Sequence, residues 1–142
     1  MVKNEMKMTI LSKSSNESYA RVAVAAFISQ LDPTIEEIND IKTAVSEAVT
    51  NCIVHAYKDC VGKIYITVSL SDQNVVVIKI RDRGCGIKDV KKAREPLFTT
   101  GGEERAGLGF AVMESFMDRL NVRSRENIGT TVSMIKKLAY RV

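Results

Sequence analysis

Cysteine, aromatic residues and long apolar runs are all scarce in this sequence. Its 3 cysteines are an odd number and form no Cys-x-x-Cys motif, which argues against a disulfide framework and against a zinc site. No apolar run approaches the roughly 18 residues of a membrane-spanning helix, and the N-terminus lacks the apolar stretch of a signal peptide. These absences predict a cytoplasmic protein that keeps its thiols reduced and does not engage a membrane.

The charge of the chain is modest and dispersed. The formal net charge is +4, and the 6% of residues that are aromatic are not interleaved with the basic ones. This pattern disfavours direct nucleic-acid binding. A chain of 142 residues, 45% of them hydrophobic, is long enough to bury one ordinary core. We therefore expect a single globular domain, residues 1–142.

Hydrophobic periodicity predicts the element order β-α-α-β-β-loop-α-β-β. Thr34 and Glu37 form a capping-box pair at the start of the second helix. Strands with one apolar face need a cover, which the helices supply. The predicted fold class is α+β: a two-layer sandwich with three main helices on one face of a mixed β-sheet. The expected strands are 6–12, 64–70, 76–80, 120–125 and 130–138, and the expected helices are 19–31, 34–57 and 108–119.

A polar stripe runs along the second predicted helix. Glu47, Asn51 and His55 are spaced four residues apart, so they share one side of the helix, beside its apolar stripe. Such a stripe is either the polar margin of a half-buried helix or one wall of a ligand site. The spacing alone leaves both interpretations open.

Glycine-rich loops follow the central hairpin. Asp82 ends a strand, and Gly84 and Gly86 come directly after it, where a backbone without side chains can approach a flat ring or a phosphate. The segment Gly107-Leu108-Gly109 is predicted to open the third helix, whose N-terminus would attract phosphate. The residues between these loops, 96–106, suggest a lid, and Thr130 lies at the same end of the last strand. The pattern is neither a Walker loop nor a Rossmann fingerprint.

The ordered combination is more specific than any of its parts. Glu-x-x-x-Asn-x-x-x-His, then Asp-x-Gly-x-Gly, then Gly-x-Gly, then Gly-Thr resembles the ATP-binding domain shared by gyrase, Hsp90, histidine kinases and MutL. The resemblance covers essentially the whole chain. It implies ATP and Mg²⁺ as cofactors, with Glu47 as the catalytic base and Asn51 as the metal ligand. It also implies a nucleotide site made of Asn51, His55, Asp82, Gly84, Gly86, Thr99, Arg105, Gly107, Leu108, Gly109 and Thr130.

Four further segments resemble the stand-alone anti-sigma serine kinases of sporulating bacteria. They are Asn-Glu-Ser-Tyr-Ala-Arg at 16–21, Val-Ser-Glu-Ala-Val-Thr-Asn at 45–51, Pro-Leu-Phe-Thr-Thr at 96–100 and Met-Glu-Ser-Phe-Met-Asp at 113–118. That resemblance implies a homodimer with two partners. It would hold a sigma factor of the sigma-F type and phosphorylate a serine of an anti-anti-sigma protein.

The same resemblance implies that Glu17 and Arg21 contact the partners, although the sequence by itself shows only an exposed helix there. Two alternatives remain. One is a related stress-response anti-sigma kinase, and the other is an ATP-dependent binding module without kinase activity.

Overall fold

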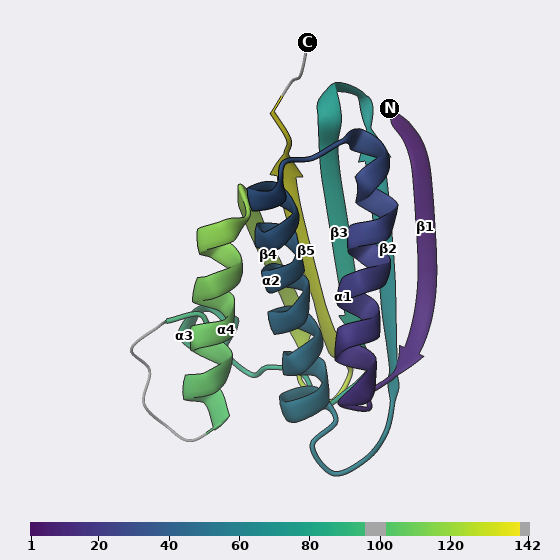
Figure 1. The fold of residues 1–142 in the computed structure, drawn as a ribbon. Helices are drawn as coiled ribbons and strands as arrows, with labels where there is room; N and C mark the ends of the chain where they lie inside the picture. Colours follow the sequence, from purple (N-terminus) through teal and green to yellow (C-terminus); the bar gives the residue numbers. More distant parts are fainter. Residues whose placement is uncertain (96–101, 140–142) are drawn as a thin grey trace.

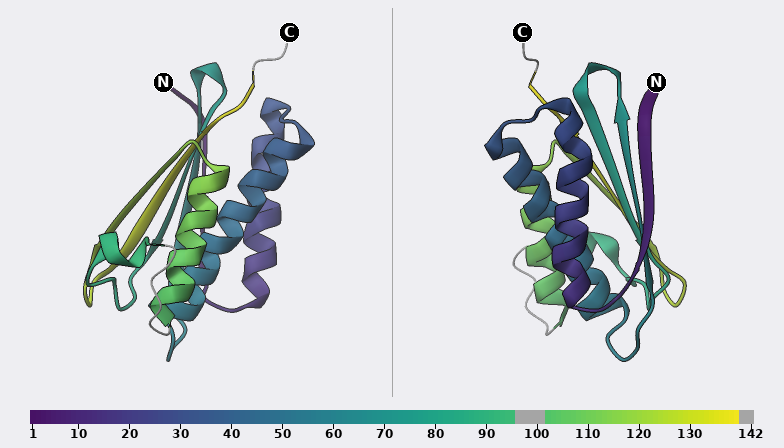
Figure 2. Two further views of the ribbon diagram at one scale, coloured as in Figure 1. Left: turned by 90° about the vertical axis from the view of Figure 1, so that its left-hand side faces the viewer. Right: turned by 45° about the vertical axis from the view of Figure 1, so that its right-hand side comes forward.

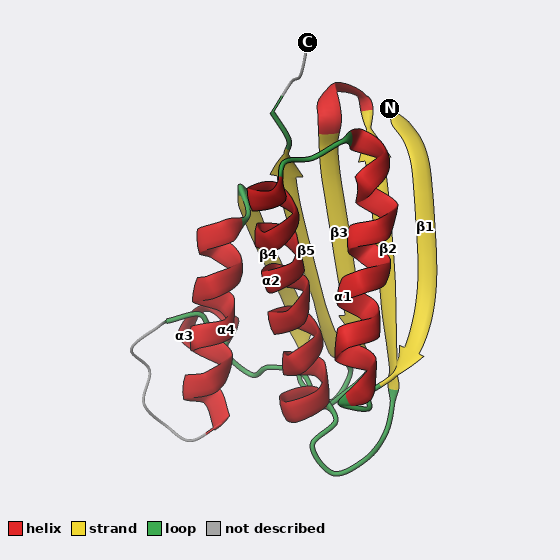
Figure 3. Cartoon of the chain, in the orientation of Figure 1, coloured by secondary structure: helices red, strands yellow, loops and turns green. Residues whose placement is uncertain are grey.

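The computed structural model describes residues 1–95 and 102–139, with the backbone alone for residues 102–107. Within these residues the chain forms five strands and four α-helices, coloured along the sequence in Figure 1 and by secondary structure in Figure 3. The elements are β1 (Val2–Leu11), α1 (Ser15–Ile28), α2 (Ile35–Asn51), β2 (Lys63–Ser71), β3 (Val75–Asp82), α3 (Val90–Ala93), α4 (Gly102–Phe116), β4 (Arg119–Arg125) and β5 (Gly129–Lys137).

The strands form one sheet in the order β1-β2-β3-β5-β4. Helices α1, α2 and α4 lie on one face of this sheet, and Figure 2 shows the two layers edge-on. The predicted two-layer α+β sandwich is therefore confirmed. The sheet was expected to be mixed, whereas all four strand pairings in the structure are antiparallel.

The core lies between the two layers. Alternate residues of β2 and β3 point toward the helices, as the period-two pattern predicted, and they meet one apolar stripe of α2. The capping box at the start of α2 is present, with the Glu37 N–H donating to Thr34 Oγ1 and the Thr34 N–H donating to Glu37 Oε1. Fully buried core side chains include Ile41, Val45, Ile64, Ile66, Val68, Val76, Ile78, Ile80, Met113 and Met134.

The α-helix of α2 does not run on to residue 57. It passes at Cys52–Ala56 into one π-helical turn, a feature that often marks functional sites. The wider turn rotates the last residues of the segment relative to a regular helix, so His55 is offset from the line through Glu47 and Asn51.

The prediction for the start of the last long helix was wrong. Helix α4 begins at Gly102, so Gly107 and Gly109 lie inside it and do not open it. Each glycine costs about 1 kcal/mol in a helix interior, but the residues before them, Glu-Glu-Arg-Ala, are good helix formers. Gly109 is also a point of close packing with α2, described below. The short helix α3 was not predicted, because four residues carry too little periodicity.

Candidate functional site

Two cavities meet where the end of α2 faces the loops of the sheet. The larger has a volume of about 440 Å³ and lies between the end of α2, the residues after β3 and the start of β5. The smaller, about 300 Å³, lies between α2 and α4 and is lined by Glu47, Leu108 and Gly109 among others. Asn51 and His55 line both cavities, so the predicted polar stripe forms the boundary between them.

Asp82 is the central polar group of the larger cavity. Its side chain is only 5% exposed at the end of β3. Its Oδ1 atom accepts hydrogen bonds from the backbone N–H of Gly84 (2.9 Å) and of Thr130 (3.2 Å). Its Oδ2 atom receives only the weak thiol donor of Cys52, at 3.5 Å. One oxygen is therefore held in place by the backbone, while the other keeps acceptor capacity for a ligand donor.

Burial sets the ionisation of this pair. Burial raises the pKa of Asp82 above its ordinary value, while hydrogen bonds from Gly84, Cys52 and Thr130 act in the opposite direction. Burial also raises the pKa of Cys52 well above its usual value, and the nearby Asp82 carboxylate adds to the shift. Cys52 therefore stays a neutral thiol that can donate to Asp82. Cys52 is buried, and the sequence did not indicate its contact with Asp82.

The loop after β3 is held between two other segments. The Cys85 N–H donates to the Ala56 carbonyl of the π-helical turn at 3.1 Å, and the Cys85 carbonyl accepts from the Asn127 N–H at 2.6 Å. A Cβ on Gly84 would lie 2.3 Å from the Ala56 carbonyl oxygen, and Gly86 has a φ of +72°. Both glycines are therefore required for the loop's path. Gly86 lines the larger cavity, whereas Gly84 contributes its N–H to Asp82.

Asn51, Glu47 and Gly109 lie together at the smaller cavity. A Cβ on Gly109 would come within 3.2 Å of both side-chain amide atoms of Asn51 and of Glu47 Oε2. The absence of a side chain at Gly109 thus lets α4 pack closely against α2. The Asn51 Nδ2 atom is buried and has no hydrogen-bond partner. A buried orphan donor beside two cavities is a group that a ligand could satisfy.

Thr130 connects the larger cavity to the turn between β4 and β5. It is 8% exposed, and its hydroxyl lies 2.7 Å from the Ser124 hydroxyl. Ser124 in turn accepts from the Ile87 N–H at 2.7 Å, so it ties β4 to the loop after β3. Ser124 was missed from the sequence, because nothing there shows that β4 and β5 pair at this position.

The structure describes no side chain for three of the predicted nucleotide residues. Thr99 lies outside the described residues, and Arg105 and Gly107 lie where the structure describes the backbone of α4 alone. Two lysines that line the larger cavity, Lys58 and Lys88, were not predicted. Their positions in the sequence, three residues after His55 and two residues after Gly86, are the signal that could have indicated them.

Glu17 and Arg21 lie on α1 and line neither cavity. Arg21 donates from Nη2 to the Ser18 hydroxyl at 3.2 Å, and that hydroxyl lies 3.5 Å from Glu17 Oε2. Arg21 is not simply exposed, as the sequence suggested. It is half-buried, and its Nε atom is buried with no hydrogen-bond partner.

None of the helices described is long and apolar enough to cross a membrane. Within the same residues, no group of three or more His, Cys, Asp or Glu side chains is placed to hold a metal ion.

The chain matches known proteins over nearly its full length. The family model of the histidine kinase-like ATPase domain matches residues 12–136. The anti-sigma F factor of Bacillus subtilis (strain 168) is 54% identical over 140 residues, 97% of this chain and 95% of that protein. The anti-sigma F factor of Caldanaerobacter subterraneus subsp. tengcongensis is 60% identical over 134 residues, 94% of this chain and 93% of that protein.

Solved structures share the fold at low sequence identity. The RsbU and RsbW domains of a Mycobacterium tuberculosis protein align with a TM-score of 0.73 at 19% identity, over 99% of this chain and 34% of that one. The histidine kinase domain of a blue-light activated kinase from Erythrobacter litoralis aligns with a TM-score of 0.56 at 21% identity, over 86% of this chain and 60% of that one.

Proposed function

Because the chain belongs to the histidine kinase-like ATPase family, and within it to the anti-sigma F factors, we propose that it is a cytoplasmic anti-sigma serine kinase of sporulation. In this proposal a homodimer holds a sigma-F-type sigma factor. It also uses MgATP to phosphorylate a serine of an anti-anti-sigma protein, which inactivates that protein.

The hydrogen bonding of the Asp82 carboxylate is the observation that best supports nucleotide binding. Oδ1 is fixed by two backbone donors, Oδ2 receives only the weak thiol donor of Cys52, and Asp82 lines a cavity whose volume, about 440 Å³, suits a small-molecule ligand. An acceptor held this way is suited to the exocyclic amine of adenine. The apolar atoms of Ile87 and Phe110, which line the same cavity, would contact the faces and edges of the base.

The boundary residues suit the phosphate end of the nucleotide. Asn51 separates the two cavities, and its amide oxygen is a hard ligand of the kind that Mg²⁺ prefers. Mg²⁺ usually keeps its waters and the substrate phosphates as its other ligands, so one protein side chain is enough. Its chemistry there would be to neutralise phosphate charge. The orphan Nδ2 of Asn51 would then donate to a phosphate oxygen.

Glu47 lines the smaller cavity and Asp82 the larger one, and Asn51 lines both. We assign it the role of general base. As the serine oxygen bonds to the γ-phosphorus, Glu47 takes the hydroxyl proton, and the bond from the γ-phosphorus to the bridging oxygen breaks to release ADP. General-base catalysis of this kind contributes about 10²- to 10⁴-fold, and positioning of the phosphates supplies most of the remainder.

Helix α1 supports the partner-binding part of the proposal. Tyr19 and Val22 are 60% and 57% exposed, and they flank Arg21, whose Nε atom has no partner. Exposed apolar side chains around an arginine are typical of the centre of a protein interface. Because Glu17 and Arg21 lie outside both cavities, partner binding and nucleotide binding can be separated by mutation.

A phosphotransfer assay with Glu47→Gln tests the kinase. The variant, [γ-³²P]ATP and the anti-anti-sigma protein are incubated together, while sigma-factor binding is measured in parallel. We expect phosphotransfer to fall about 10²-fold or more with sigma-factor and ATP binding retained. Glu36→Gln, an exposed glutamate of the same helix, is the matched control. Wild-type phosphotransfer by Glu47→Gln would remove the general base from the proposal and favour a binding module in which ATP acts only as a ligand.

A further inference from the structure

The face of the sheet that points away from the helices is strongly basic. No described helix covers it (Figure 2). Of the acidic residues in the five strands, Glu5 lies on β1, at one edge of the sheet, and the buried Asp82 lines both the larger nucleotide cavity and the outer cavity described below. Basic residues at alternate positions point outward from β3 and β4: Lys79, Arg81, Arg119, Arg123 and Arg125.

Strand pairing concentrates this charge at one end of the sheet. Arg81 on β3 and Arg123 on β4 are both paired with Thr131, on opposite sides of β5. Arg125 follows two residues later on β4 and pairs with Gly129, and Arg83 comes just after β3. Neighbouring strands are about 4.8 Å apart and alternate residues about 7 Å apart. The Cα atoms of Arg81 and Arg123, which lie on either side of Thr131, are therefore about 10 Å apart.

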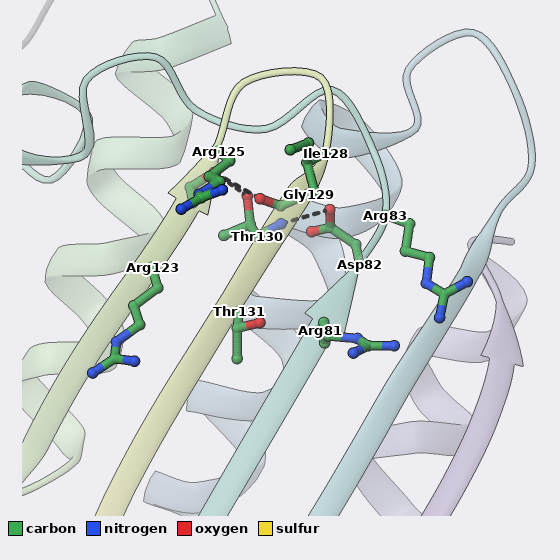
Figure 4. A pocket seen from close by; sticks show the side chains of 10 residues that line it. Arg81, Asp82, Arg83, Arg123, Arg125, Ile128, Gly129, Thr130 and Thr131 are labelled. Carbon is green, nitrogen blue, oxygen red and sulfur yellow. Dashed lines mark hydrogen bonds between the residues drawn. The ribbon is translucent and has the colours of Figure 1, made fainter.

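We call these four residues, Arg81, Arg83, Arg123 and Arg125, the arginine face. All four are exposed, and together with Thr131 they line a cavity of about 370 Å³. In Figure 4 the guanidinium groups diverge: Arg81 and Arg83 extend to one side of β5, and Arg123 and Arg125 extend to the other. A site for one phosphate would need converging donors. This arrangement instead presents positive charge along both sides of a trough.

The trough has a small, polar floor and one preorganised wall. The floor is formed by β5 residues that include Gly129, which has no side chain, and Thr131, which has a small one. The Thr131 hydroxyl can donate or accept a hydrogen bond. On one side, the guanidinium groups of Arg81 and Arg83 lie over the Tyr65 ring, at 4.8 and 5.2 Å from its centre. Cation–π contacts of this kind hold the two arginines in place before any partner binds.

We propose that the arginine face binds an acidic, extended segment of a partner protein. An extended chain fits a trough between two strands, and acidic residues at alternate positions repeat every 7 Å or so, close to the spacing of Arg123 and Arg125. Carboxylates pair with guanidinium groups through charge-assisted hydrogen bonds. This surface lies on the opposite side of the sheet from α1, so it adds a contact that the proposed function does not use.

Two other occupants fit the surface less well. A second copy of the chain in an isologous dimer would bring the same patch against itself, and the arginines would repel one another. Single-stranded nucleic acid is usually bound by stacking its bases on aromatic rings, and Tyr65, the aromatic residue of the described face, is already covered by Arg81 and Arg83.

The test uses fluorescence anisotropy with labelled probes on the full-length protein. The probes are a peptide of alternating glutamate and serine, a peptide of alternating glutamine and serine, and single- and double-stranded DNA. We expect the glutamate peptide alone to bind, with an affinity that falls as salt rises. The double variant Arg81→Glu with Arg123→Glu should bind the glutamate peptide about tenfold or more weakly than the wild type. Each lost exposed ion pair lowers the affinity by up to a few-fold, and the reversed charges add repulsion. Arg81→Lys with Arg123→Lys should retain most of the binding.

The matched control is Lys13→Glu with Lys91→Glu. It changes the net charge by the same amount at exposed positions outside this cavity, and it should bind the glutamate peptide like the wild type. Thermal unfolding and ATP affinity establish that each variant is folded. Equal loss of binding in both double variants, absence of glutamate-peptide binding, or tighter binding to DNA would overturn the proposal. So would self-association of the wild type that the Arg81 and Arg123 reversals abolish.

Discussion

Replacing Asp82 with asparagine changes the group that we place against adenine and leaves its shape unchanged. The asparagine Oδ1 can still accept the backbone N–H groups of Gly84 and Thr130, because both donate to one oxygen in the wild type. The second oxygen, which faces Cys52, becomes an NH₂ group. That group would point its hydrogens at the hydrogens of the adenine amine, and neither partner would have an acceptor.

The expected loss follows from that mismatch. An unsatisfied buried polar group costs about 1–3 kcal/mol, which corresponds to a rise of about 5- to 150-fold in the dissociation constant for ATP. GTP has a carbonyl where ATP has the exocyclic amine. The variant should therefore discriminate less between ATP and GTP than the wild type does.

The same substitution should not weaken the fold. Burial raises the folded-state pKa of Asp82 above its unfolded value, so the ionised carboxylate opposes folding at neutral pH. This penalty is absent below the unfolded pKa, about 3.9. It grows as pH rises from that value through the folded pKa, and it is complete above it. Asp82→Asn should thus be at least as stable as the wild type at pH 7, and its advantage should shrink toward pH 4.

Isothermal titration calorimetry with ATP and GTP, and thermal unfolding between pH 4 and 7, measure both effects. Asp72→Asn, at the exposed turn between β2 and β3, is the control for loss of one carboxylate. Unchanged ATP affinity in Asp82→Asn would refute the placement of adenine. A loss of stability at pH 7 would show that Oδ2 has a structural role in the unliganded protein.

Three further outcomes are expected. Asn51→Ala should weaken ATP binding measured in Mg²⁺ by at least about tenfold and ATP binding measured in EDTA less, because EDTA removes the metal contact and leaves only the proposed Nδ2–phosphate contact. Equal loss in both conditions would contradict the role of Asn51 as a metal ligand. Arg21→Glu should disrupt binding to the sigma factor, the anti-anti-sigma protein or both in pull-down assays, and its ATP affinity should be unchanged. Normal binding to both partners would remove Arg21 from the interface. Cys85 is exposed and lines the larger cavity, so MgATP should slow its alkylation. Alkylation of Cys60, which is also exposed, should not change, and peptide mass spectrometry measures both rates. Rapid labelling of Cys85 that nucleotide does not slow would contradict the proposed nucleotide site.

Local patterns in the sequence predicted the elements that local interactions determine. The capping box at Thr34 and Glu37, the alternation in the central hairpin and the apolar stripe of the second helix all depend on residues close in sequence. Each of these features is confirmed. The Glu47, Asn51 and His55 stripe also lines cavities, as its periodicity and the glycine loops together suggested.

The features that were missed or wrong depend on contacts between distant segments. The start of α4 was misplaced because glycine is a strong helix breaker in isolation, whereas here Gly109 allows the close approach of α4 to Asn51. The pairing of Arg81 and Arg123 with one threonine requires the strand order β3-β5-β4. The bond between Ser124 and Thr130 requires the register of the β4–β5 hairpin. Strand order is set by tertiary packing, so the separate segments do not reveal it.

The most direct test of the account is a two-dimensional ¹⁵N NMR titration, first with adenosine and then with MgATP. The backbone amides of Cys85 and Thr130 should shift with both ligands, because both residues line the larger cavity. The side-chain NH₂ signals of Asn51 should move strongly only with MgATP, because its unpartnered Nδ2 would gain a phosphate acceptor. Shifts of the Asn51 side chain with adenosine alone, or no response at Cys85 and Thr130 to either ligand, would contradict the proposed placement of the nucleotide.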